Sequence, residues 1–289
     1  VSSNLFDISS LQEQYNKVKA NKLHAIGTAG RLYYGKDNKI KFEPDGDARP
    51  ILRFPHRKED NLEGAIVLYE GPYRNQEGQT PHNLYVVCHD PYGQNQSADS
   101  SSLGAAYVIK RINNISKPDD LIVASYVGRP HTQDEYNKNL FMLADYYNAK
   151  IGFENDRGAV IQYARQHRKL HRLQEEFEML DKKELRSRNV KRNYGMHTTE
   201  ARKRQGELYI RDWLNAVRSD DGDTITLNLH KIYDLALLQE LIKFNHRGNF
   251  DRVMALMIGM YHTRELYNAE VKEIIEDNSS NEWFDKNYY

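Results

Sequence analysis

The middle of the chain alternates short apolar runs with turn-forming residues, which is typical of successive β-strands. The apolar runs cover residues 84–88, 103–109 and 121–127, and segments rich in Gly, Pro, Asp and Asn separate them. This order predicts an antiparallel meander of three strands.

The first third of the chain carries weaker signals of the same kind. After a helical lead-in, the turn residues 35–38 (GKDN) lie between the β-forming stretches 31–34 and 39–42, which predicts a hairpin. Residues 50–54 and 65–69 are two further strand candidates.

Helical signals follow the meander. Thr132 and Glu135 have the spacing of a capping box, and the helix that they begin is expected to lead into a short strand ending at Glu154. Apolar residues at helical spacing recur at 159–185, 202–217, 235–244 and 251–265. Three strands, a crossing helix, a further strand and later helices predict an α/β fold, an RNase H-like mixed β-sheet flanked by helices on both faces.

We expect three parts in the chain. Residues 1–62 form a small lead-in or linker with a helix and the β-hairpin, residues 63–275 form the RNase H-like domain, and residues 276–289 form a polar C-terminal tail. The sequence does not assign a role to the first 60 residues.

The bulk composition restricts the function class only weakly. Lys plus Arg and Asp plus Glu number 41 each among 289 residues, so no overall charge favours a nucleic-acid partner. Cys88 is the only cysteine, which excludes an intrachain disulfide or a cysteine-based zinc site and favours a reducing compartment. No uncharged apolar stretch reaches the roughly 18 residues of a membrane span, so we expect a cytosolic protein and no membrane partner.

Three acidic residues at the ends of different apolar elements are the main chemical signal. Taken singly, each has a structural explanation: Asp90 precedes a proline in a turn, Glu154 ends a strand, and Asp251 places negative charge at a helix N-terminus. Their order on the first meander strand, the fourth strand and the last core helix would bring them together in such a sheet.

Converging carboxylates are the ligands that hard divalent cations need, and paired ions stabilise both the attacking and the leaving oxygen of a phosphodiester. We therefore expect Asp90, Glu154 and Asp251 to bind two Mg²⁺ or Mn²⁺ ions for hydrolysis. Asp99, in the following loop, is a further candidate ligand, and Asp234 is expected to be a solvated helix acid.

Positive charge is concentrated between the second and third acids. Residues 157–204 hold 14 Lys and Arg against six Asp and Glu. Basic residues beside hydroxyls are typical of phosphate contacts, although a solvated helix face explains part of the run equally well. The predicted DNA contacts are Lys191, Arg192, Thr198, Thr199, Arg202, Lys203 and Arg204.

The sequence around these acids resembles the nuclease domain of the large terminase subunit of tailed bacteriophages. Four separate motifs carry the resemblance, and a fifth stretch at 65–72 (AIVLYEGP) is also similar; the four are 85–93 (YVVCHDPYG), 152–158 (GFENDRG), 195–203 (GMHTTEARK) and 249–256 (NFDRVMAL). Each motif is loose by itself, but four in register are fairly specific.

The resemblance implies a metal-dependent endonuclease that cuts double-stranded DNA concatemers during genome packaging. It also implies the terminase ATPase domain, the small terminase subunit and the capsid portal as partners, and the cytoplasm of an infected bacterium as location. One departure matters: the family's N-terminal ATPase is not found. Residues 30–37 (GRLYYGKD) mimic a P-loop but carry Asp37 in place of the Ser or Thr that would hold Mg²⁺. We expect a separated C-terminal portion.

Two alternatives stay open. The chain could be a non-catalytic DNA-gripping or docking module of the packaging motor, which retains the acids for structural reasons. It could also be a Holliday-junction-resolvase-like nuclease of the same superfold, which would prefer four-way junctions over linear duplex.

Overall fold

The structure is a computed structural model of the chain. The structure describes residues 4–92, 102–111, 120–155, 158–177 and 194–287, the last range by its backbone alone beyond residue 271.

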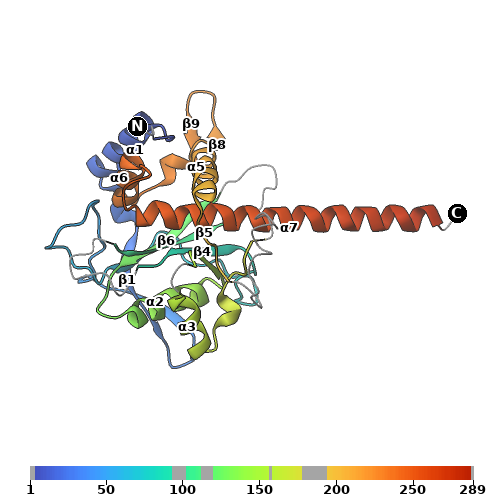
Figure 1. Ribbon diagram of the computed structural model, residues 1–289, viewed down its shortest axis with the longest axis horizontal. Helices are drawn as coiled ribbons and strands as arrows, with labels where there is room; N and C mark the ends of the chain where they lie inside the picture. Colours follow the sequence, from blue (N-terminus) through green and yellow to red (C-terminus); the bar gives the residue numbers. More distant parts are fainter. Residues whose placement is uncertain (1–3, 93–101, 112–119, 156–157, 178–193, 288–289) are drawn as a thin grey trace.

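A seven-stranded mixed sheet in the order β2-β1-β3-β6-β5-β4-β7 is the centre of the fold (Figure 1). Its strands are β1 (Thr28–Tyr34), β2 (Ile40–Pro44), β3 (Ala65–Leu68), β4 (Tyr85–Asp90), β5 (Gly104–Lys110), β6 (Leu121–Gly128) and β7 (Lys150–Phe153). Strands β4, β5 and β6 pair antiparallel, which confirms the predicted meander. Strand β7 pairs parallel with β4, so the predicted mixed α/β sheet is confirmed.

The predicted hairpin is also present and extends this sheet. Strands β1 and β2 pair antiparallel, and β1 pairs with β3. The predicted lead-in therefore shares its sheet with the predicted nuclease domain, and the boundary at residue 62 stays a prediction.

The strand predicted at residues 50–54 is wrong, because the segment is irregular. Its backbone groups bond to side chains of later helices instead of to a neighbouring strand. The N–H of Phe54 donates to Gln239 at 2.7 Å, and the carbonyl of Ile51 accepts from Arg252 at 3.0 Å. Because these backbone groups already have hydrogen-bond partners, the segment does not need to pair with a strand.

Helices cover both faces of the sheet. Helix α2 (Gln133–Tyr146) begins with the predicted capping box of Thr132 and Glu135. The other helices are α1 (Ile8–Ala20), α3 (Ala159–Gln166), α5 (Glu200–Leu214), α6 (Leu235–Lys243) and α7 (Asp251–Asn287), with short 3₁₀ turns η1 (Leu23–Ile26), η2 (Leu170–Arg172) and η3 (Asn228–Lys231). A separate hairpin joins β8 (Val217–Asp220) to β9 (Ile225–Leu227).

Two helices differ in length from their predictions. The helix predicted over 159–185 ends at Gln166, and Arg168 shortly afterwards has a left-handed φ of 56°. Helix α7 is longer than predicted, since its backbone continues to Asn287 through the segment expected to be a polar tail. Figure 1 shows its second half extending away from the body of the protein. Among the described helices, none is long and apolar enough to cross a membrane.

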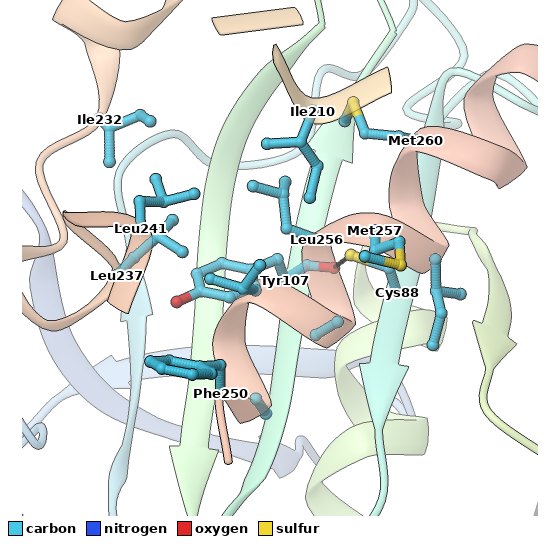
Figure 2. Packing of buried hydrophobic residues seen from close by; sticks show 14 of the residues in the cluster. Cys88, Tyr107, Ile210, Ile232, Leu237, Leu241, Phe250, Leu256, Met257 and Met260 are labelled. Atoms are coloured by element: carbon cyan, nitrogen blue, oxygen red, sulfur yellow. Dashed lines mark hydrogen bonds between the residues drawn. The ribbon is translucent and has the colours of Figure 1, made fainter. Parts of the chain in front are cut away.

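Two hydrophobic clusters fill the space above and below the sheet, and β4 contributes to both. Val86 and Cys88 belong to the cluster that contains α5, α6 and the first half of α7, whereas Tyr85 and Val87 belong to the cluster under α2 and α3. A strand buried on both faces has a continuous apolar sequence. Figure 2 shows the α7 side, where Met257 lies beside Cys88.

Candidate metal and nucleic-acid site

Asp90 and Glu154 lie at the same end of two neighbouring parallel strands. Asp90 is the last residue of β4 and is 7% exposed. His89 of β4 pairs with Phe153 of β7, and the N–H of Glu154 donates to the His89 carbonyl at 3.3 Å. Because the strands are parallel, the residues that end them are brought to one edge of the sheet.

Asp251 reaches this edge from α7. The backbone N–H of Leu103 donates to its Oδ2 at 2.8 Å, and Ser102 Oγ donates to its Oδ1 at 3.1 Å. Asn249 adds a third hydrogen bond at 3.3 Å. Leu103 directly precedes β5, whose first residues pair with the end of β4, so Asp251 is held close to Asp90.

The three acids act on one another electrostatically. Burial raises the pKa of Asp90 well above its usual range, and the charges of Asp251 and then Glu154 raise it further. Burial also raises the pKa of Asp251, although its hydrogen bonds from Leu103 and Ser102 oppose that shift. Asp251 and Glu154 thus both lie within electrostatic reach of Asp90, which is the arrangement that the strand and helix ends predict.

The donor chemistry of this acid cluster, defined as Asp90, Glu154 and Asp251, suits a hard divalent cation. All donors are carboxylate oxygens, which Mg²⁺ and Mn²⁺ prefer, and a cation would relieve the repulsion that raises the pKa of Asp90. In the part of the chain that the structure describes, however, no three His, Cys, Asp or Glu side chains converge as ready metal ligands. Asp99, the fourth predicted ligand, lies outside the described residues.

His89 does not join the cluster as a base. Its Nδ1 lies 3.0 Å from the Ala105 carbonyl, and its ring stacks on Tyr136 with centroids 5.2 Å apart. Burial lowers the pKa of His89 to about 4, so the imidazole is neutral at pH 7. We assign it a packing role.

A cation that the sequence patterns did not single out lies beside the cluster. Arg129 follows β6, donates from Nη1 to the Ser102 carbonyl at 3.0 Å, and places its guanidinium 5.3 Å from the centroid of the Tyr92 ring. Ser102 in turn donates to Asp251. The signal that pointed to the acids, a polar residue directly after a strand, also applies to Arg129.

The predicted hydroxyl and basic residues begin next to Glu154. The N–H of Met196 donates to the Phe153 carbonyl at 2.8 Å, and the N–H of Asn155 donates to the Met196 carbonyl at 2.9 Å. Gly195 allows the chain to approach the end of β7 this closely, because its φ is +74° and a Cβ would lie 2.6 Å from the Phe153 oxygen.

Thr198 and Thr199 follow this contact, and their hydroxyls differ in hydrogen bonding. Thr199 is the N-cap of α5, with its hydroxyl accepting from the N–H of Arg202 at 3.3 Å. The hydroxyl oxygen of Thr198 is buried and has no hydrogen-bond partner among the described protein atoms.

The predicted cations of α5 differ in exposure. Arg202 is buried and donates to the His197 carbonyl at 2.5 Å, whereas Lys203 is partly exposed and lies 3.9 Å from Glu200. Arg204 is exposed. Two further predicted contacts, Lys191 and Arg192, lie outside the described residues.

A buried ion network holds the start of α7 behind the acid cluster. Glu240 accepts from Arg252 Nη1 at 2.9 Å and from the N–H groups of Arg252 and Val253 at 2.9 and 3.1 Å. Asp234 caps α6 and accepts from the hydroxyl of Tyr107 at 2.7 Å. The expectation that Asp234 is a solvated acid is therefore wrong, since its side chain is only 10% exposed and is held by Tyr107.

Comparison with known proteins gave matches only among solved structures. No protein-family model and no curated protein sequence matches the chain. The large terminase nuclease from thermophilic phage G20c with bound zinc is 15% identical over 72% of this chain and 91% of that chain, with a TM-score of 0.38. The same nuclease with bound magnesium is 14% identical over 73% of this chain and 92% of that chain, again with a TM-score of 0.38. The solved structures to which the chain is similar are thus of a large terminase nuclease from a phage.

Proposed function

We propose that this chain is a metal-dependent endonuclease that cuts double-stranded DNA. The observation that carries the proposal is the gathering of Asp90, Glu154 and Asp251 from β4, β7 and α7 at one sheet edge, where their charges act on one another. A compact group of carboxylates is costly unless protons or cations neutralise it, and nucleases use such groups to bind divalent ions.

In the proposed site the three acids would hold two Mg²⁺ or Mn²⁺ ions. When bound, the ions would supply positive charge for the attacking water and for the departing 3′ oxygen of a phosphodiester. The chain's own groups orient the ligands: the Leu103 N–H and the Ser102 hydroxyl fix both oxygens of Asp251. No protein nucleophile is needed for this hydrolysis.

The DNA backbone would pass from the cluster toward the N-terminus of α5. Thr199, Lys203 and Arg204 would contact phosphates there, because the Met196 bridge places their segment beside Glu154. Hydroxyls, basic side chains and helix N-termini are common phosphate contacts. We infer little sequence preference, since such contacts carry no base information.

The biological setting rests on the motif resemblance alone. It supports cleavage of phage DNA concatemers in the cytoplasm of an infected bacterium. The partners would be the terminase ATPase domain, the small subunit and the portal.

The test is cleavage of supercoiled plasmid by the purified chain across Mg²⁺ and Mn²⁺ concentrations, with EDTA as the metal-free control. Asp90→Ala should lose nicking and linearisation, whereas Asp221→Ala, which removes an exposed acid of the β8–β9 turn, should retain both. Unchanged Mn²⁺-dependent nicking by Asp90→Ala would refute the site.

The rival functions give different results in the same assay. Salt-sensitive duplex binding without any cleavage would favour a DNA-gripping module. Strong preference for four-way junctions over linear duplex would favour a resolvase-like nuclease.

A further inference from the structure

Residues 51–62, which the sequence analysis left without a role, lie against the start of α7. The ring of Phe54 packs on Phe250 with centroids 5.2 Å apart. The carbonyl of Ile51 accepts from Arg252 at 3.0 Å. These contacts place the segment beside the first residue of α7, which is Asp251.

The far end of the segment is fixed to the same edge of the sheet. The N–H of Arg129 donates to the Leu62 carbonyl at 2.5 Å. The side chain of Arg129 bonds to the carbonyl of Ser102, whose hydroxyl donates to Asp251. The segment therefore spans from α7 to the end of β6 along the rim of the acid cluster.

The part between these anchors has a net charge of +1. It carries Arg53, His56, Arg57 and Lys58, followed by the acids Glu59 and Asp60. The Asp60 carboxylate is turned inward, with its side chain 14% exposed, 3.3 Å from Arg53. It also accepts from the N–H of Arg57 at 2.7 Å. Arg57 and Lys58 are exposed, so their charges face solvent at the rim.

Electrostatics agree with this placement. Burial lowers the pKa of His56, and Asp251 and Arg129 are among the charges that act on it. The middle of the segment is thus within electrostatic reach of both the acid cluster and Arg129.

The strand order places the segment across the acid cluster from α5. Along this edge Glu154 follows β7, Asp90 ends β4, Arg129 follows β6 and Leu62 precedes β3. Strands β7 and β3 are four strand spacings apart, about 19 Å at roughly 4.8 Å per spacing. At 3.4 Å per phosphate, one DNA strand would present about five or six phosphates over that span.

We propose that Arg57, Lys58 and Arg129 form a second DNA-backbone contact, on the β3 side of the acid cluster and across it from α5. The proposal rests on the proposed nuclease function, because it assumes that a duplex crosses the cluster. Its ligand is the phosphate backbone of double-stranded DNA, which would be held on both sides of the acids.

The test measures duplex affinity as a function of salt, by fluorescence anisotropy in EDTA. Each phosphate contact contributes about 0.9 to the slope of log K against log salt. Arg57→Ala with Lys58→Ala should lower the magnitude of the slope by about 2. The binding constant at 0.1 M salt should fall on the order of 10- to 100-fold. Each phosphate contact raises the binding constant about eightfold between 1 M and 0.1 M salt, and two contacts are lost. Adding Arg129→Gln should lower the slope by about one more.

The matched control removes two charges elsewhere. Lys36 and Lys39 are exposed in the turn of the β1–β2 hairpin, and Lys39 lines a groove with Asn148, near the opposite end of β4. Lys36→Ala with Lys39→Ala should leave the slope unchanged. A wild-type slope in the Arg57/Lys58 variant, or an equal loss in the control, would overturn the proposal.

This design separates the two proposals. Binding in EDTA needs no cleavage, so a wild-type chain that binds but never cuts refutes the nuclease and leaves the slope test valid. A chain that cuts normally with an unchanged slope in the double variant refutes only the second contact.

Discussion

The backbone N–H of Leu103 donates to Oδ2 of Asp251 at 2.8 Å, joining residues 148 positions apart. The bond ties the first residue of α7 to the residue before β5. Because a backbone donor has a fixed direction and does not titrate near neutral pH, it holds the Asp251 carboxylate at the sheet edge in any protonation state of its neighbours. The position of this acid is thus set by sheet and helix together.

Replacing Asp90 by Asn should stabilise the metal-free protein at pH 8. Burial and the charges of Asp251 and Glu154 raise the pKa of Asp90, so the folded state binds this proton more tightly than the unfolded state. Its contribution to stability therefore falls as pH rises through the window above the ordinary carboxyl pKa. Thermal melting in EDTA should show a higher Tm for Asp90→Asn at pH 8 and a smaller difference at pH 5. Asp221→Asn should change neither, and a lower Tm for Asp90→Asn at pH 8 would contradict the repulsion.

Metal binding should weaken at acidic pH for the same reason. Protons compete with the cation for Asp90, so the apparent affinity for Mn²⁺ should fall by up to about tenfold per pH unit where one proton is displaced. Calorimetric titrations with Mn²⁺ at pH 6, 7 and 8 would measure this, with proton release checked in two buffers. Asp90→Asn should bind Mn²⁺ more weakly and with less pH dependence. Equal affinity at all three pH values would count against Asp90 as a ligand.

The sheet and the positions of Asp90 and Glu154 at its edge were readable from sequence because both depend on local signals. Strand ends are marked by apolar runs followed by turn residues, and Asp90 and Glu154 occupy those ends. The capping box of α2 was equally local, since Thr132 and Glu135 are three positions apart.

What could not be predicted depends on contacts between distant residues. Asp234 has the sequence context of a helix cap, and only the fold brings Tyr107 and Arg252 to its carboxylate. The 50–54 segment has β-forming residues, but bonds from α6 and α7 replace strand pairing. Arg202 resembles its neighbours in a basic run, yet its position on α5 turns it inward.

Removing the buried carboxylate of Glu240 should destabilise the protein strongly. Glu240 and Arg252 are 1% exposed each, and breaking one partner of a buried pair costs about 3–5 kcal/mol because the other charge stays uncompensated. Chemical denaturation of Glu240→Ala should show this loss, and Glu240→Gln should lose less because it retains an acceptor. The control is Glu43→Ala, which breaks the exposed Arg31 pair and should leave the unfolding midpoint nearly unchanged, because solvent screens an exposed ion pair. Equal losses in both variants would contradict the buried network.

Arg202 and Arg204 should have separable roles. Arg202→Ala leaves the buried His197 carbonyl without this donor, so it should destabilise the fold by about 1–3 kcal/mol. Arg204→Ala removes an exposed cation, so it should leave the Tm unchanged and lower the salt slope of duplex binding by about 1. Thermal melting and anisotropy titration of the two variants would show which residue acts in folding and which in DNA binding. A stable Arg202→Ala with reduced DNA binding would show that Arg202 itself contacts DNA.

The distance between α7 and the sheet should depend on Gly259. A Cβ at this position would lie 2.6 Å from Ile109 Cδ1 and 2.9 Å from Cys88 Sγ, so the helix could not keep its place. Gly259→Ala should therefore destabilise by about 1–3 kcal/mol through overpacking, partly offset by a gain of up to about 1 kcal/mol in helix propensity. Denaturant unfolding measures the sum.

Two further variants test this explanation of Gly259. Gly206→Ala in α5 would place a Cβ 2.2 Å from Cγ of Met257, a buried residue of α7, so it should also destabilise through overpacking. Ile109→Val removes the atom nearest the new methyl group and by itself should cost about 0.5–1.5 kcal/mol. Combined with Gly259→Ala it should cost clearly less than the sum of the single changes, because the two sites share one contact. Strict additivity would mean that Gly259 is required for another reason than the close approach of α7 to β5.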